Sequence, residues 1–333
     1  MASFAQFGND LHTGKRSYNI VGRRKLWYTI ATVMMLVALV GPFLRGGFVF
    51  GIEFTGGSEF IVSDVAAQSQ APAVTAVSTV VPAAVPKVTT VGTNTIRVQT
   101  DQLTSDESRQ LSTELATAYN VPETKVTSSF IGPSWGADIT GQALRGLGIF
   151  LVLAAVVMAL YFRTWKMSLA AMIALLHDLI ITAGVYGLTG FEITPAAVIG
   201  FLTILGYSLY DTVVVFDKVR ENTAGESNRT FGGSVNLAVN QTLVRSINTS
   251  VVALLPVASI LFIGAFLLGA GTLRDISLAL LIGMIVGTYS TIFIAAPLYA
   301  HLREGEPGIR QADKKALALR ARADQQSGAE ISA

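Results

Sequence analysis

The sequence predicts an α-helical polytopic membrane protein with six transmembrane helices and one small α+β extracytoplasmic domain. Composition is the first reason: of 333 residues, 51% are hydrophobic and only 14% are charged, whereas soluble domains carry roughly 25% charged residues. The second reason is a series of six apolar runs, each near the length of about 20 residues that crosses a bilayer. The chain has no cysteine and three scattered histidines, which excludes thiol chemistry and argues against a metal site.

The six predicted spans are Leu26–Leu44, Ala143–Phe162, Met167–Leu188, Pro195–Phe216, Leu243–Leu267 and Leu273–Leu298. The first run follows three basic residues, as a secretory signal does, but it is longer than the apolar core of a signal and no small-residue cleavage site follows it. We interpret it as a retained anchor. The predicted parts are a cytoplasmic segment (1–25), the first helix (26–44), the extracytoplasmic domain (45–142), helices two to six (143–300) and a basic cytoplasmic tail (301–333).

The orientation follows from the basic residues, because Lys and Arg concentrate in the cytoplasmic loops of membrane proteins. An orientation with both termini in the cytoplasm places the basic clusters there, and the loop between the third and fourth spans then carries none outside. We interpret the basic tail as a positive-inside anchor and predict no nucleic-acid binding. The residues placed inside are Lys15, Arg16, Arg23, Arg24, Lys25, Arg163, Lys166, Lys218, Arg220, Arg229, Arg303, Arg310, Lys314, Lys315, Arg320 and Arg322.

The segment between the first two spans is too long for a simple loop and alternates between strand and helix signals. The order β-α-β-β-α-β predicts a small ferredoxin-like sandwich. An alternative for Ala66–Ala84, which is dense in Ala, Val, Ser, Thr and Pro, is a partly ordered insert. The expected elements are a strand at Phe48–Ser63, a helix at Ala71–Val81, strands at Lys87–Thr90 and Thr95–Thr100, a helix from a Ser105 cap to Tyr119, and a strand at Thr124–Ile131.

Three charged residues within the spans are the candidate functional residues, since intramembrane charge costs a few kcal/mol and persists mainly where it has a role. They are Asp178, Asp211 and Arg245. Asp211 lies late in the fourth span and Arg245 at the cytoplasmic entry of the fifth, so the two residues are expected at similar depth on neighbouring antiparallel helices. The start of the fifth span is also unusually polar, which favours a place against other helices or a hydrated path.

A carboxylate beside a guanidinium stays ionised, whereas a desolvated carboxylate without one tends to take up a proton. Asp211 and Arg245 are therefore predicted to form a proton relay, with Asp178 in a supporting role. Charge placement does not separate this hypothesis from a structural ion pair that only holds helices together. The polar neighbours expected to support the relay are Tyr210, Ser208, Gln241, Thr242 and His177.

At this point four segments resemble the SecD/SecF family of protein-export membrane proteins. Gly51–Gly57 (GIEFTGG) resembles an acidic-x-x-Gly-Gly motif of the family, here Glu53, Gly56 and Gly57. Ile131-Gly132-Pro133 resembles the family sequence before the second span. Ile204–Asn222 is similar to the fourth-span signature nearly throughout, and Gln241–Ile247 to the fifth-span one. Tyr210 departs from the pattern, which more often has Asn before the aspartate, and Trp135 stands in a normally aliphatic stretch.

The resemblance implies one six-helix half of a resistance-nodulation-division (RND) transporter in the bacterial plasma membrane, with SecD as the other half. It implies a non-enzymatic translocation factor that uses protons, and no other cofactor, to assist late steps of protein export. Asp211 would be the proton carrier and Arg245 its charge partner. The implied partners are SecD, the SecYEG channel, YajC, translocating preproteins and membrane lipids.

Three alternatives stand beside this reading. A proton-coupled exporter of small molecules or lipids belongs to the same superfamily, although such proteins typically join two halves in one chain. An intramembrane aspartyl protease would use Asp178 and Asp211 as a dyad that shares a proton, but the second aspartate lacks a Gly-x-Gly-Asp motif. A purely structural scaffold would move no protons at all.

Overall fold

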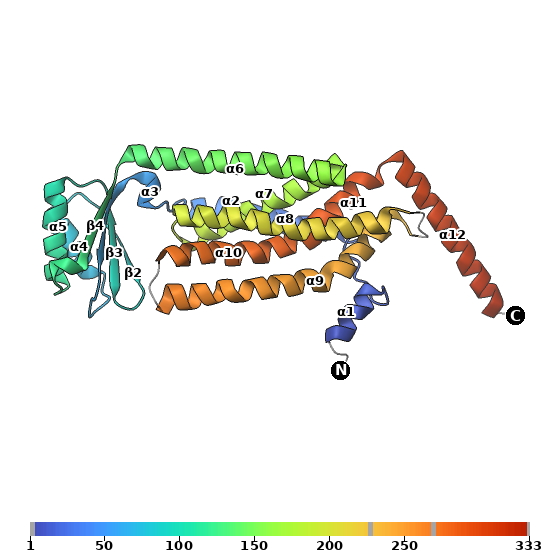
Figure 1. The fold of residues 1–333 in the computed structure, drawn as a ribbon, viewed down its shortest axis with the longest axis horizontal. Helices are drawn as coiled ribbons and strands as arrows, with labels where there is room; N and C mark the ends of the chain where they lie inside the picture. The colour runs from blue at the N-terminus through green and yellow to red at the C-terminus, as the bar shows by residue number, and fades with distance from the viewer. Residues whose placement is uncertain (1–3, 226–228, 268–270, 332–333) are drawn as a thin grey trace.

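The computed structural model describes residues 4–225, 229–267 and 271–331. It is an elongated bundle of long helices with a small α+β domain at one end, and both chain termini lie toward the opposite end (Figure 1). We call these the sheet end and the far end. Residues 1–3 and 332–333 of the predicted terminal segments lie outside the described residues. Within the described residues, six helices are long and apolar enough to cross a membrane, so the predicted number of spans is confirmed.

The helices extend beyond the apolar runs that predicted them. Polar turns outside the lipid keep their backbone hydrogen bonds within the helix, so the apolar run marks only the central part of each one. Segments with π-helical hydrogen bonding at Ile260–Leu267 and Thr291–Ala295 extend α9 and join α10 to α11. The helices are α1 Phe4–His12, α2 Arg24–Leu44, α6 Pro133–Phe162, α7 Trp165–Thr189, α8 Pro195–Thr223, α9 Phe231–Ser259, α10 Gly271–Ser290, α11 Ala296–Glu304 and α12 Pro307–Ile331.

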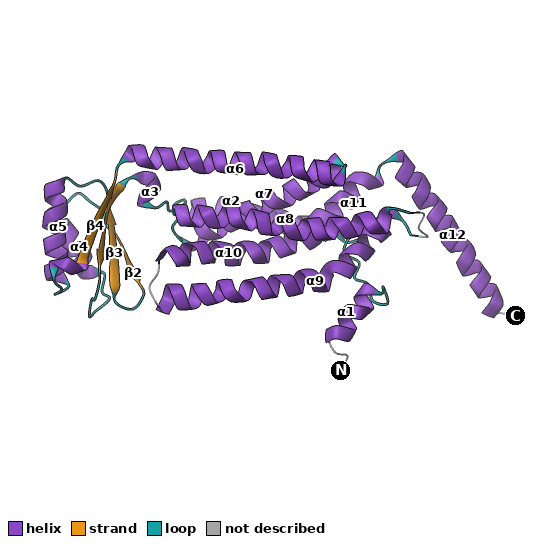
Figure 2. Cartoon of the chain, viewed as in Figure 1, coloured by secondary structure: helices purple, strands orange, loops and turns teal. Residues whose placement is uncertain are grey.

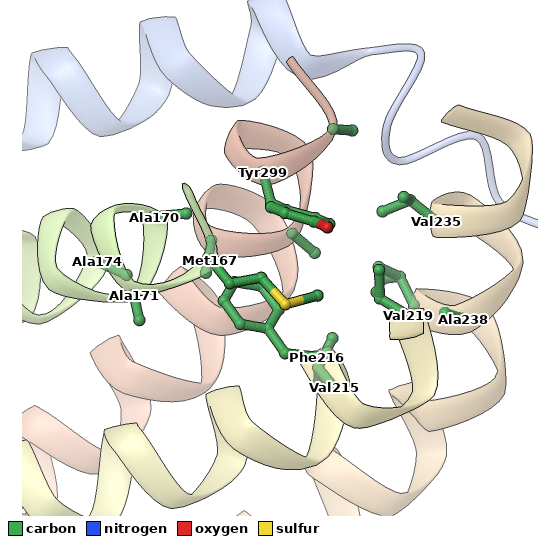
Figure 3. Packing of buried hydrophobic residues seen from close by; sticks show 14 of the residues in the cluster. Met167, Ala170, Ala171, Ala174, Val215, Phe216, Val219, Val235, Ala238 and Tyr299 are labelled. Carbon is green, nitrogen blue, oxygen red and sulfur yellow. The ribbon is translucent and has the colours of Figure 1, made fainter. Parts of the chain in front are cut away.

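The main apolar core fills the far end of the bundle, where α7, α8, α9 and α11 meet (Figure 3). Phe216 and Tyr299 are fully buried there, with ring centroids 5.6 Å apart. A smaller core around Tyr186 and Phe201 lies at the sheet end. By contrast, less than a quarter of the span residues in α2, α6 and α9 are buried. The central helices of the six are therefore α7, α8 and α10.

Glycines allow the central helices to approach closely. A Cβ on Gly283 of α10 would overlap the side chain of Ile204 on α8, and one on Gly287 would lie 3.1 Å from the Ser208 Cβ. A Cβ on Gly184 of α7 would likewise overlap the backbone of Ala38 on α2. Small residues are the usual means of close helix contact in lipid. The glycines of α10 thus form its close contact with α8.

The α+β domain contains a four-stranded antiparallel sheet in the order β2-β3-β1-β4. Figure 2 shows the strands between two helices on the outer side and the membrane bundle on the other. Phe60, Val62, Ile96 and Val98 point to the helices and form a closed core with Leu111 and its neighbours. The elements are β1 Gly57–Val62, α4 Ala71–Val80, β2 Lys87–Val91, β3 Thr95–Thr100, α5 Ser105–Ala118 and β4 Val126–Ile131, preceded by the short helix α3 Ile52–Thr55.

The predicted strand at Phe48–Ser63 was too long. Its first half contains α3 and an isolated bridge between Phe50 and Ile193. Gly57 then begins β1 with φ +144°, in a place where a Cβ would lie 2.5 Å from the Thr100 carbonyl oxygen. Only glycine fits this turn into the strand.

Two further local expectations are corrected. The cap of α5 is Thr104 rather than Ser105: its hydroxyl accepts from the Glu107 N–H while the Glu107 carboxylate accepts from the Thr104 N–H, which is a capping box. The final strand begins at Val126, because a 3₁₀ turn occupies Glu123–Lys125. The α4 region is helical, and its Ala73 and Val77 are fully buried in the domain core.

Candidate functional site

The two intramembrane aspartates lie on adjacent central helices and are both buried. Asp178 is in the middle of α7 with 1% exposure, and Asp211 is in α8 with 6% exposure. Carboxylates at such depth need hydrogen bonds or a proton, because desolvation of a lone charge is costly. The partners of each carboxylate therefore decide what it can do.

Asp178 is held between α7 and α8. The Ser208 hydroxyl donates to Asp178 Oδ2 at 2.6 Å, and His177 Nδ1 lies 3.2 Å from Asp178 Oδ1. Gly287 of α10 passes close to the same pair, since a Cβ there would be 3.5 Å from Asp178 Oδ2. Asp178 thus has a partner for each oxygen and joins three central helices.

Asp211 links α8 to α9, and only one of its two carboxylate oxygens has a hydrogen-bond partner among the described residues. The Ser246 hydroxyl donates to Asp211 Oδ1 at 2.8 Å. Asp211 Oδ2 is buried and has no hydrogen-bond partner among the described residues. Such an oxygen is free to take a proton or to bind water.

Arg245 does not pair directly with Asp211. Its side chain is exposed, and no ion pair within 4 Å joins the two residues in the described part of the chain. Arg245 directly precedes Ser246 on α9, so its charge lies one residue from the group that bonds Asp211. The sequence predicted that both groups lie at a similar depth. In the structure, Ser246 rather than Arg245 contacts Asp211 directly.

The predicted supporting residues divide into two groups. Ser208 and His177 contact Asp178, as described above. Tyr210 is 57% exposed on the outer face of α8. Gln241 bonds to the His12 carbonyl of α1 and to Asn222 near the far end, and Thr242 bonds to the Ala238 carbonyl of its own helix. The structure therefore does not bring Tyr210, Gln241 or Thr242 to either carboxylate.

Further polar groups line the same helix contacts. Thr212 and Thr291 share a hydrogen bond of 2.9 Å between α8 and the π-helical segment, and Ser250 bonds to Thr288 between α9 and α10. A π-helical turn frequently marks a functional place in a helix. Ser246 and Ser250 belong to the polar start of the fifth span. Their spacing of four residues on one helix face is the signal that would have identified them as inward-facing.

Several buried polar atoms of the central helices lack a described partner. They are His177 Nε2, Tyr207 Oη, Tyr289 Oη and Asp211 Oδ2. Unpaired buried donors and acceptors are commonly satisfied by water in a polar cavity. No group of three His, Asp or Glu side chains suited to a metal ion occurs among the described residues.

The predicted family motif lies where the chain enters the α+β domain. Glu53 is in α3, and its Oε2 atom is buried without a described hydrogen-bond partner. Gly56 and Gly57 follow with φ +76° and +144° and turn the chain into β1. The motif therefore joins the first membrane helix to the sheet and is separate from the two aspartates.

These features define a multi-pass membrane protein whose central helices bury two hydrogen-bonded carboxylates and whose sheet end carries an α+β domain. The family described as "Protein export membrane protein SecD/SecF, C-terminal" matches residues 111–305. The chain belongs to the SecD/SecF family.

The relatives agree with this assignment. The chain is 45% identical to the protein translocase subunit SecF of Streptomyces coelicolor, over 96% of this chain and 86% of that protein. It is 42% identical to SecF of Mycobacterium tuberculosis, over 94% and 73%.

A crystal structure of SecDF from Thermus thermophilus matches with a TM-score of 0.71 and 28% identity over 87% of this chain. The match spans 39% of that longer protein. A second structure, SecDF in its super-membrane-facing form, matches with a TM-score of 0.62 over 90% of this chain and 40% of that one. Both matches place this six-helix arrangement and its domain within a longer SecDF chain.

Proposed function

We propose that this protein is a translocase subunit that uses the proton motive force to assist late steps of protein export. The observation that carries the proposal is Asp211, a buried carboxylate with one oxygen bonded to Ser246 and the other without a described partner. A proton carrier must be stable with and without its proton, and this arrangement suits both states.

Ser246 can serve either state of the carboxylate. A hydroxyl donates to an ionised oxygen and can accept from a protonated one, whereas a guanidinium only donates. Arg245, exposed and acting through space, favours the ionised form when it is near. Approach of this charge would therefore release the proton, and its withdrawal would let the carboxylate take one up. Asp178, with both oxygens engaged, would hold α7 and α8 together and support the path.

The orientation and partners belong to the same proposal. Both termini would be cytoplasmic in a bacterial plasma membrane, with the α+β domain, which we take to be ferredoxin-like, outside. Two features support this topology: the termini lie away from the sheet (Figure 1), and the basic clusters lie near them. The apolar helices α2, α6 and α9, whose spans are less than a quarter buried, support a second six-helix half, which would be SecD. SecYEG, YajC and translocating preproteins would be the further partners.

The test compares Asp211→Asn with wild type in inverted membrane vesicles that contain the channel and the SecD partner. Wild type should increase preprotein release when a proton gradient is imposed, and the variant should not, although it inserts and binds its partner normally. Asp217→Asn, a more exposed carboxylate on the same helix, is the matched control. A variant that stimulates export as well as wild type would refute the mechanism. Gradient-driven efflux of a small molecule or lipid, without effect on preproteins, would favour the exporter instead.

A further inference from the structure

The sheet has a polar face that is buried against the membrane bundle. Side chains alternate along strands, and in β1 and β3 the alternation separates Phe60, Ile96 and Val98 on the helix side from Glu59, Arg97 and Gln99 on the other. The strand register places Glu59 opposite Gln99, and Gln99 opposite Lys87 of β2. Glu59 and Gln99 are 8% and 5% exposed, so this polar row is covered.

Glu192, in the loop between α7 and α8, contacts this polar row. Glu192 is 8% exposed. Its Oε2 lies 3.3 Å from Arg97 Nη1, and its Oε1 accepts from Gln99 Nε2 at 3.0 Å. Lys87 Nζ lies 3.5 Å from the same Oε1. One carboxylate from the membrane bundle thus reaches three side chains of the sheet.

Glu59 completes the cluster from within the sheet. Its Oε2 lies 2.6 Å from Arg97 Nε and accepts from Gln99 Nε2 at 3.1 Å. Arg97 and Lys87 therefore lie against the carboxylates of Glu59 and Glu192. A buried ionic cluster of this kind contributes modestly to net stability, but it fixes geometry because each member has directional partners.

The backbone beside Glu192 is joined to the same region. The Ile193 N–H donates to the Val49 carbonyl at 2.8 Å, and the Gly51 N–H donates to the Ile193 carbonyl at 2.9 Å. The linker before this bridge contains Gly46 and Gly47, both with φ above +100°. Two successive glycines restrain the domain little on the α2 side. On the other side β4 continues through Gly132 into α6, and the Glu192 loop contacts the sheet between these two connections.

We propose that Glu192 is the positioning residue through which the α7–α8 pair holds the α+β domain in one orientation. The loop joins the helix of Asp178 to the helix of Asp211, so a shift of one helix against the other moves Glu192 and, through Arg97 and Gln99, the sheet. The coupling of helix movement to the sheet rests on the proposed function, whereas the fixed orientation of the domain does not. Loss of the Glu192 charge therefore frees the sheet to shift relative to the α7–α8 loop.

The absence of cysteine makes the orientation directly measurable. Spin labels are placed at Ala118→Cys on α5 and Ile199→Cys on α8, both exposed positions, in the full chain in lipid nanodiscs. Pulsed electron paramagnetic resonance then gives the distance distribution. Wild type and the control Glu123→Gln, an exposed carboxylate of the same domain, should give one narrow population. Glu192→Gln should give a broad or second population, and the conservative Glu192→Asp should restore most of the narrow one.

Amide hydrogen exchange at Gly51 and Ile193 is a second measurement, independent of the labels. Exchange at both amides should rise at least tenfold in Glu192→Gln with no change in the domain core. The proposal is overturned if Glu192→Gln keeps the wild-type distance distribution and exchange rates.

Vesicle export separates the two hypotheses. Asp211→Asn should lose stimulation while it keeps the narrow distance population, and Glu192→Gln should lose both. A Glu192→Gln protein with a broad distribution and full stimulation would overturn the coupling role. If wild type itself shows no gradient-dependent stimulation, the proposed function fails, and the distance measurement still decides whether Glu192 fixes the domain.

Discussion

Ser246 of α9 donates its hydroxyl hydrogen to Asp211 of α8 across 2.8 Å, while the neighbouring Arg245 side chain is exposed. The direct partner of the buried carboxylate is thus a neutral group. A neutral hydroxyl lets the carboxylate change its charge without leaving a buried cation unpaired. The pair of Asp211 and Ser246, rather than a fixed ion pair, is therefore the arrangement that suits a proton carrier.

Replacement of Ser246 by alanine should leave the Asp211 carboxylate without a described hydrogen-bond partner. We expect a loss of about 1–3 kcal/mol in the free energy of unfolding, the usual result when a buried polar group loses its partner. Thermal unfolding in detergent or nanodiscs measures this loss. The control is Ser259→Ala on the same helix, where the exposed hydroxyl bonds only to the Leu255 carbonyl. An equal, small effect of both substitutions would contradict a special role for Ser246.

Replacement of Arg245 tests whether its charge acts on Asp211 without a direct contact. Because Arg245 is exposed and forms no described ion pair, Arg245→Ala should change the free energy of unfolding by less than about 1 kcal/mol. The same variant should greatly reduce gradient-dependent export, and Arg245→Lys should retain part of it because the charge is kept. Vesicle export and thermal unfolding, measured on the same preparations, check both statements. Unchanged export in Arg245→Ala would show that the charge has no part in the cycle.

The sequence predicted the bundle well because lipid imposes a strong rule. Apolar runs near 20 residues long must form helices in a bilayer, and the six runs correspond to the six long helices. It also located Asp178 and Asp211, since a charge within an apolar run is visible without any structure. The strand pattern of Thr95–Thr100 was equally readable, because Ile96 and Val98 alternate with Arg97 and Gln99.

The sequence did not predict which polar groups pair with one another, because the pairing depends on which helix faces meet. Arg245 was adjacent to the correct contact, but the rotation of α9 points Ser246 inward and Arg245 outward. Likewise nothing local indicates that Glu192, alone in a short loop, meets three residues of a distant sheet. The start of β1 was missed because Phe50 and Phe54 look like strand residues, whereas the turn at Gly56 and Gly57 delays the strand.

Glu53 should give the α+β domain a pH-dependent stability. Burial raises the pKa of the Glu53 carboxyl, with Arg97 opposing and Glu192 and Glu59 adding to the shift. The folded state therefore binds this proton more tightly than the unfolded state, and the contribution to stability falls as the pH rises from the ordinary pKa through the raised one. Glu53→Gln should remove this dependence and be the more stable protein at neutral pH. Thermal unfolding of both proteins from about pH 4 to about pH 8 measures the difference, since this interval extends upward from the ordinary carboxyl pKa. A parallel pH profile for the two proteins would exclude Glu53 as its source.

Gly283 should be the position at which the contact of α8 with α10 is most sensitive to size. A Cβ there would overlap the Ile204 side chain, and a packed core answers such an insertion by shifting backbone and rotamers. We expect Gly283→Ala to lower the free energy of unfolding by about 1–3 kcal/mol, and Ile204→Ala in the same chain to recover part of that loss because it removes the overlap. Gly206→Ala is the matched control, since nothing lies within 4 Å of its Cβ; it should be neutral or stabilising by up to about 1 kcal/mol through helix propensity. Thermal unfolding of wild type and the three variants tests this expectation. If Gly283→Ala behaves like Gly206→Ala, α8 and α10 do not pack at this distance. Gly287 of α10 would then not hold Ser208 against Asp178.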